Sequence, residues 1–101
     1  MQNPAPFELS DTAEAVLALV DKLGPAEVTT YGDLAAEAGT GARQVGAIMR
    51  RYGHLTDWWR VVRADGSSHD PARSVPFWDG AGLRHDGTRV SLREHRHTFP
   101  G

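Results

Sequence analysis

The sequence contains no cysteine. This absence excludes a disulfide framework, a thiolate metal site and a thiol nucleophile. The sequence also lacks the run of about 20 apolar residues that a membrane-spanning helix needs, and residues 1–10 lack the basic start and apolar centre of a secretory signal peptide. We therefore expect a cytoplasmic protein with no membrane partner.

The length and composition suit one small folded domain. With 101 residues, of which 40% are hydrophobic and 24% are charged, the chain can build a single core but not two independent domains. We expect an N-terminal arm over residues 1–10, one domain over residues 11–96 and a C-terminal tail over residues 97–101.

Positive charge is concentrated in the second part of the chain. The formal net charge is only −2, but residues 1–40 hold seven acidic residues and one basic residue, Lys22, whereas residues 41–101 hold ten arginines and six acidic residues. A surface that binds phosphates needs local rather than global positive charge. Nucleic acid therefore remains a candidate partner for the second part.

The sequence predicts a first helix over residues 11–23. Ser10 and Asp11 offer side-chain oxygens to the unpaired amides of a helix N-terminus, and Glu14 follows Asp11 at the capping-box spacing. Apolar residues then recur at intervals of three and four, which places them on one face; they are Val16, Leu19, Val20 and Leu23. A Gly-Pro pair ends the helix.

Two further short helices with a tight turn between them are predicted next. Residues 31–39 indicate a brief helix closed by glycine, and residues 42–51 indicate a second helix. This second helix turns an apolar face inward, with Val45, Ile48 and Met49, and leaves outward Arg43, Gln44, Ala47 and Arg50. The arrangement is typical of a helix-turn-helix, although helical hairpins with a basic face also occur in proteins that never contact DNA.

Beyond these helices the sequence predicts a small β element. Residues 58–62 and 88–92 are β-like, each beside a Gly-containing turn, and can pair as a wing. Residues 67–76 are predicted as a loop, and a short helical turn is expected around Phe77 and Trp78. The expected fold class is α-rich (α+β), a single small winged helix-turn-helix domain.

Four segments, in this order and at these spacings, resemble the DNA-binding domain of the O6-alkylguanine-DNA alkyltransferases and of their cysteine-less relatives, the alkyltransferase-like proteins. They are residues 28–35, which are similar to the tyrosine segment of the family, residues 41–49, which are similar to its recognition helix with an intercalating arginine, and residues 58–62 and 82–93. The resemblance covers about residues 11–96. It implies a domain of the alkyltransferase C-terminal type.

The segment at Trp58 differs from the alkyltransferases in the residues that carry out their reaction. By the resemblance, Trp58 takes the position of the alkyl-accepting cysteine, Trp59 that of the activating histidine and Asp57 that of a proline. An indole is neither a competent acceptor nor a base at neutral pH, so we expect no enzymatic alkyl transfer. Trp58 is expected to line a pocket, where stacking on a base is worth about 1–3 kcal/mol, and Trp59 to pack in the core.

The resemblance implies roles for particular residues in DNA binding. Arg43 would enter the base stack from the minor groove and fill the space left by an extruded guanine, and Tyr31 would press on the phosphate 3′ of the lesion. The further DNA-contacting residues expected are Thr29, Thr30, Ala42, Gln44, Gly46, Ala47 and Arg50. The expected lesion pocket comprises Tyr31, Trp58, Arg60 and Arg73, the last of which is a cation facing the alkylated base.

The expected function is non-enzymatic recognition of DNA damage. By resemblance the protein would bind double-stranded DNA as a monomer, flip O6-alkylguanine into the pocket bordered by Trp58 and flag it for nucleotide-excision repair. It would then be nucleoid-associated when bound to DNA. No cofactor and no metal are expected, because His95 and His97 offer only two ligands and a flexible basic tail is the simpler interpretation of that segment.

Alternatives stay open at the level of the sequence. A helix-turn-helix transcriptional regulator would read undamaged DNA through Arg43, Gln44 and Arg50, with a sequence preference and a dimeric state. An enzyme of an unrecognised type is another alternative, and so is a domain that binds only protein, through the acidic first helix.

Overall fold

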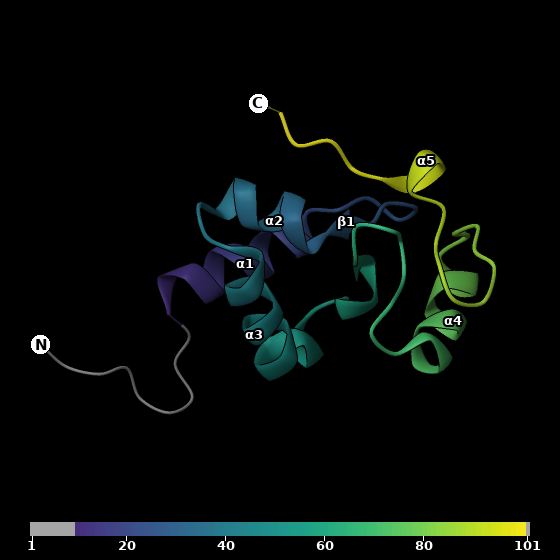
Figure 1. The fold of residues 1–101 in the computed structure, drawn as a ribbon, viewed down its shortest axis with the longest axis horizontal. Coiled ribbons are helices and arrows are strands. Elements are labelled where there is room, and N and C mark those ends of the chain that lie inside the picture. Colours follow the sequence, from purple (N-terminus) through teal and green to yellow (C-terminus); the bar gives the residue numbers. More distant parts are fainter. Residues whose placement is uncertain (1–9, 101) are drawn as a thin grey trace, which may run out of the picture.

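Three helices form one end of the molecule, and two others lie at the opposite end (Figure 1). The computed structural model describes residues 10–100. The first three helices are α1 (Asp11–Asp21), α2 (Tyr31–Ala38) and α3 (Ala42–Tyr52), and the others are α4 (Pro71–Gly80) and α5 (Leu92–His95). Among the described residues, no helix combines the length and the apolar character that crossing a membrane requires.

The predicted first helix is confirmed as α1. The Ser10 hydroxyl accepts a hydrogen bond of 3.1 Å from the Ala13 N–H, which satisfies one free amide of the first turn. The helix ends at Asp21, slightly before the predicted end, because the N–H groups of Lys22 and Leu23 donate to carbonyls three positions back and tighten the last turn. Its buried face consists of Ala13, Val16, Leu17 and Val20.

The predicted helix-turn-helix is confirmed as α2 and α3. Thr30 begins α2 by accepting a hydrogen bond of 3.0 Å from the Asp33 N–H, and Gly39 ends it with φ of 71°, a left-handed conformation that favours glycine. Val45 and Met49 of α3 are buried in a core shared with Val16, Val20 and Leu34. The exposed residues of α3 include Arg43, Gln44, Ala47 and Arg50.

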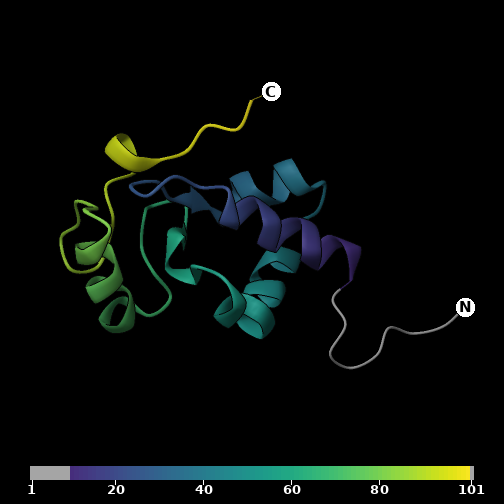
Figure 2. The same ribbon diagram turned by 180° about the vertical axis from the view of Figure 1, so that it is seen from behind.

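A two-stranded parallel sheet joins the three-helix end to the rest of the molecule. β1 (Thr29–Thr30) pairs with β2 (Val61–Val62), with Thr29 opposite Val61 and Thr30 opposite Val62. Successive side chains of a strand point to opposite faces, so Val61 packs in the core of α1, α2 and α3 whereas Val62 packs in a second core. This second core also contains Val28, Trp59, Trp78, Leu83 and Val90. Seen from behind, α4 and α5 again lie at the end away from the helix-turn-helix (Figure 2).

The predicted pairing of the wing is wrong. Residues 58–62 do not form one strand, because Trp58–Arg60 form a 3₁₀ turn and only the two residues of β2 are extended. Residues 88–92 contact the chain after β2 instead, through an antiparallel bridge between Ser67 and Arg89. β2 pairs instead with β1, which lies far from it in the sequence. No local sequence pattern indicates a pairing across this separation.

α4 replaces much of the loop predicted for residues 67–76. The Asp70 carboxylate accepts a backbone hydrogen bond of 3.3 Å from within the first turn, and Pro71 stands where a missing N–H costs no helical hydrogen bond. Trp78 is fully buried, and its Nε1–H donates to the Trp59 carbonyl at 2.9 Å. These contacts stabilise a helix in a segment whose polar composition indicated a loop.

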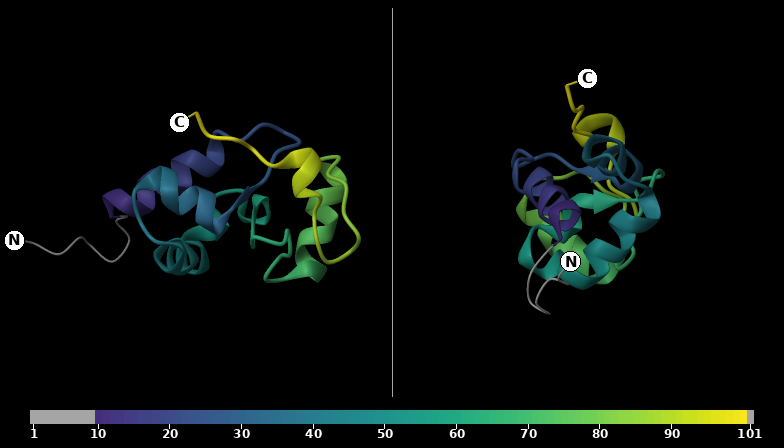
Figure 3. Two further views of the ribbon diagram at one scale, coloured as in Figure 1. Left: turned by 45° about the horizontal axis from the view of Figure 1, so that its top comes forward. Right: turned by 90° about the vertical axis from the view of Figure 1, so that its left-hand side faces the viewer.

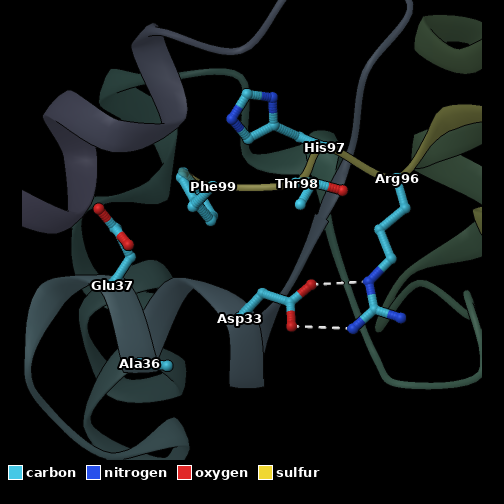
Figure 4. A pocket seen from close by; sticks show the side chains of 7 residues that line it. All are labelled: Asp33, Ala36, Glu37, Arg96, His97, Thr98 and Phe99. Atoms are coloured by element: carbon cyan, nitrogen blue, oxygen red, sulfur yellow. Dashed lines mark hydrogen bonds and ion pairs between the residues drawn. The ribbon is translucent and has the colours of Figure 1, made fainter. Parts of the chain in front are cut away.

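The C-terminal segment, predicted as a flexible basic tail, is instead bound along Val28 and α2. The Val28 N–H donates to the His95 carbonyl, and the His97 N–H donates to the Val28 carbonyl, both at 2.9 Å. Arg96 forms a bidentate ion pair with Asp33 in the first turn of α2, at 2.7 and 2.8 Å (Figure 4). Figure 3 shows this segment running back from α5 toward the three-helix end.

Arg60 is a buried structural residue. Its Nη1 lies within hydrogen-bond distance of three carbonyls in the loop of residues 24–27, at 2.8, 2.9 and 3.0 Å, and its Nε donates to Asp57 at 3.1 Å. The guanidinium also lies 4.2 Å from the ring centroid of Trp59. One side chain therefore fixes the loop after α1 to the 3₁₀ turn that precedes β2.

Replacement of this arginine should strongly destabilise the fold. Arg60→Met should lower the free energy of unfolding by about 3 kcal/mol, because it leaves several polar groups without their charged donor. Urea unfolding followed by tryptophan fluorescence measures the loss. The exposed control Arg93→Gln should change the free energy by less than about 0.5 kcal/mol. A similar small effect of Arg60→Met would contradict the structural role.

The ion pair between Asp33 and Arg96 should make stability depend on pH. Hydrogen bonds from Arg96 lower the pKa of Asp33. A carboxyl whose pKa is depressed in the folded state stabilises that state above its unfolded pKa of about 3.9 and loses this contribution as the pH falls through the folded value.

Arg96→Gln should therefore lower the free energy of unfolding near pH 7 by a small but measurable amount, because the pair is partly exposed to solvent. Near pH 3 the difference between the parent and Arg96→Gln should shrink, as judged from urea unfolding at both pH values. An equal difference at both values would show that the carboxylate of Asp33 is not the partner that matters.

Candidate nucleic-acid interface

The outward face of α3 combines small residues with exposed arginines. Ala42, Gly46 and Ala47 have little or no side chain, so another molecule can approach the helix backbone closely. Arg43 and Arg50 are exposed, and in the part of the chain that the structure describes neither forms an ion pair. Such a face can bind a partner that carries phosphates.

A cavity of about 290 Å³ opens beside this face. It lies between the start of α2, α3 and the loop that follows β2. The parallel pairing of β1 with β2 places two of the lining residues side by side. Thr30 is opposite Val62, so Tyr31, which follows Thr30, and Arg63, which follows Val62, leave the sheet at the same end. The residues that line it are Tyr31, Ala42, Gly46, Met49, Arg50, Arg63 and His69.

The hydroxyl of Tyr31 remains protonated at neutral pH. Partial burial raises the pKa of Tyr31, and the charges of Arg63 and Arg50 act in the opposite direction without cancelling this effect. A neutral phenol can donate a hydrogen bond to an anion. The two guanidinium groups add positive potential at the same point, so the site combines a donor with charge.

Trp58 is half-buried and, contrary to the expectation, does not itself line this cavity but packs behind one of its walls. His69, which lines the cavity, contacts its indole with the ring centroids 5.4 Å apart. Phe77 of α4 packs edge-to-face on the same indole at 6.0 Å, and the Arg73 guanidinium lies 5.3 Å from its ring centroid, within cation–π range. The first turn of α4 thus brings together Arg73 and Trp58, two of the residues expected in the lesion pocket.

Trp59 packs in the interior, as predicted. It is 8% exposed, its ring stacks on Phe77 with centroids 5.5 Å apart and an interplanar angle of 5°, and Arg60 also lies close to the ring. The two adjacent tryptophans therefore differ in role. Trp59 supports the turn, and Trp58 presents its ring beside the cavity.

Three residues expected to contact DNA or to form the lesion pocket serve the fold instead. Thr29 is fully buried in β1, and Thr30 is 4% exposed and uses its hydroxyl to cap α2. The guanidinium of Arg60 is held by the loop after α1, so it is unavailable to an entering base. We correct the expected set accordingly.

The remaining expected residues of α2 and α3 lie together, whereas Trp58 and Arg73 are not among the residues that line the cavity. Tyr31, Ala42, Gly46 and Arg50 meet at the cavity, and α3 exposes Arg43, Gln44 and Ala47 beside it. The side chain of Gln44 folds back toward Gly41 at the start of the helix.

The fold agrees with a known family of DNA-binding domains. The family model described as the DNA-binding domain of 6-O-methylguanine DNA methyltransferase matches residues 11–87. The chain belongs to this family. It is a cysteine-less member, as the resemblance of the sequence indicated.

A solved structure shares the fold. The chain is similar to Atl1 of S. pombe, whose crystal structure is a complex with damaged DNA containing O6-carboxymethylguanine. The TM-score is 0.77 at 22% sequence identity, over 91% of this chain and 99% of that chain. No curated protein sequence matches the chain significantly.

Sequence reasoning missed two polar residues of the cavity, Arg63 and His69. The Gly-containing turn predicted beside residues 58–62 was the available signal, because a reversal there brings the following residues back beside β2. The structure shows this return as a hydrogen bond of 2.9 Å from the Arg63 N–H to the Ser67 carbonyl. The alkyltransferase-like segments alone did not indicate that either side chain lines the same cavity as Tyr31.

Removal of the Arg63 charge should raise the pKa of Tyr31 further, because that charge stabilises the ionised phenol. Alkaline titration of tyrosinate absorbance in a Tyr52→Phe background isolates this group, since the chain has two tyrosines. Arg63→Gln should shift the titration upward, and Arg93→Gln should not. An unchanged or lower pKa in Arg63→Gln would contradict the proximity of the two side chains.

Proposed function

We propose that this protein recognises alkylated guanine in double-stranded DNA and does not remove the alkyl group. The observation that carries the proposal is the convergence of Tyr31 and the basic face of α3 at one cavity, with the ring of Trp58 packed against His69 of its wall. Membership of the methyltransferase DNA-binding family and the shared fold with a protein solved on damaged DNA support it.

In this proposal Arg43 opens the duplex. The small residues of α3 allow the helix to lie close to the minor groove, and the long planar guanidinium enters the stack where the guanine has left. Extrusion of a base costs a few kcal/mol, and less when the base is damaged and poorly paired. Recognition of damage therefore begins with the weakness of the altered base pair.

Trp58 and Arg73 then bind the extruded base. Stacking on the indole contributes about 1–3 kcal/mol, and the guanidinium, which already lies over that ring, adds about 0.5–2 kcal/mol by cation–π attraction. The base enters between them and replaces their mutual contact. The chain has no thiol to accept the alkyl group, so the lesion stays intact.

The retained lesion is then passed to nucleotide-excision repair. A protein that binds damage without repairing it needs a second activity to remove the damage, and an extruded base in a bent duplex is a structure that other proteins can recognise. One chain supplies every group named above, so the protein acts as a monomer.

The direct test compares two duplexes that differ only by one O6-methylguanine. The parent protein should bind the damaged duplex more tightly, as measured by fluorescence anisotropy. Trp58→Ala should lose about 1–3 kcal/mol of this preference, because it removes the stacking face. Arg43→Ala and Tyr31→Phe should weaken binding to the damaged duplex, and Arg93→Gln on α5 is the control. Equal affinity of the parent for both duplexes would refute recognition of the lesion.

Binding to undamaged duplexes of different sequence, together with sedimentation, separates this function from transcriptional regulation. A regulator would prefer one undamaged sequence and would sediment as a dimer on two half-sites. A monomer that binds undamaged duplexes of different sequence equally well is expected here.

A further inference from the structure

Two arginines from different elements line the same cavity as Tyr31. Arg50 lies on α3, Arg63 directly follows β2, and both line the cavity beside Tyr31. The charge of each acts on the phenol. The register of the sheet places Arg63 beside Tyr31, because Thr30 pairs with Val62 and these two residues directly precede Tyr31 and Arg63.

The positive charge at this point is not neutralised by the protein within residues 10–100. Arginine–carboxylate ion pairs there engage Arg60, Arg84, Arg89 and Arg96, and neither Arg50 nor Arg63 takes part in one. Arg63 donates from Nη1 to the Ser68 carbonyl at a long 3.4 Å. Two converging guanidinium groups and a neutral phenol donor suit an anion with several acceptor oxygens.

A DNA phosphodiester fits this site better than a charged adduct on the flipped base. The cavity continues along α3 past Ala42 and Gly46, where short side chains leave room for the sugars on both sides of a phosphate. The indole proposed to bind the base, Trp58, has Arg73 rather than Arg63 over its ring. Arg73 is thus placed to bind the base of a nucleotide, whereas Arg63 is placed to bind its phosphate.

We infer that Arg63, together with Arg50, binds the same DNA phosphate as Tyr31. The inference rests on the proposed function and extends its DNA-binding face to the loop after β2. Each of the three groups donates to the phosphate oxygens, and the two guanidinium charges replace counterions. This contact fixes the strand beside the extruded base and carries no sequence information.

The test moves one neutral methylphosphonate through the phosphates that flank a single O6-methylguanine in a duplex. The parent protein should lose about tenfold in affinity at one position, because a charge-assisted hydrogen bond is lost there. Arg63→Gln should bind the unmodified lesion duplex about tenfold more weakly, and the methylphosphonate at that position should then cost it much less than it costs the parent.

Two variants serve as controls. Arg63→Lys keeps the charge and should recover part of the affinity, whereas Arg93→Gln removes one charge from α5, on the side away from α3 (Figure 1), and should keep the profile of the parent. The slope of log affinity against log salt should fall by about 0.9 in Arg63→Gln and not in Arg93→Gln. Equal urea unfolding of all variants shows that the fold is intact.

An unchanged methylphosphonate profile in Arg63→Gln would overturn the inference. It would also fail if Arg63→Gln altered only the preference for O6-carboxymethylguanine over its neutral amide, since Arg63 would then face the adduct. If inorganic phosphate alone shifted the Tyr31 titration in the parent and DNA binding were indifferent to Arg63, the site would be one for free phosphate. The proposed function has its own readout, the preference for damaged over undamaged duplex, so its failure is seen separately.

Discussion

The parallel pairing of β1 with β2 is the constraint on which the candidate site depends. The pairing is only two residues long on each strand, but each strand continues directly into a functional element. Tyr31 begins α2 immediately after β1, Arg63 begins the loop after β2, and Trp58 precedes β2 in its 3₁₀ turn. A shift of the register by one residue would move Val61 and Val62 to the wrong cores and would separate Tyr31 from Arg63.

Buried polar and aromatic contacts hold this short sheet in place. Arg60 ties the 3₁₀ turn to the loop after α1 through three carbonyls, and Trp59 stacks on Phe77. Phe77 in turn supports the ring of Trp58. The half-buried indole of Trp58 is thus positioned by a continuous set of packed side chains, which explains why Arg60 belongs to the framework rather than to the pocket.

The sequence predicted the parts of the fold that depend on local signals. Caps and apolar periodicity located α1, α2 and α3, and the outward face of α3 followed from that periodicity. Pairing of β1 with β2 brings together residues far apart in the chain, so no local pattern showed that Thr29 and Thr30 are buried or that Arg63 lies at Tyr31. The loop predicted for residues 67–76 is wrong over much of its length, because the prediction gave more weight to the polar composition than to the Asp-Pro pair that begins α4.

The site separates the source of affinity from the source of selectivity. Arginines at a phosphate bind every duplex alike and depend strongly on salt, so under the proposed function Arg50 and Arg63 would raise affinity for any DNA. Under the proposed function, preference for damage arises where base pairing is weakened and where Trp58 and Arg73 receive the extruded base. Because phosphate contacts act before and after extrusion, they shorten the search for a lesion without changing which base is chosen. The absence of a thiol leaves this division untouched, since an alkyl acceptor contributes to neither the phosphate contacts nor the stacking.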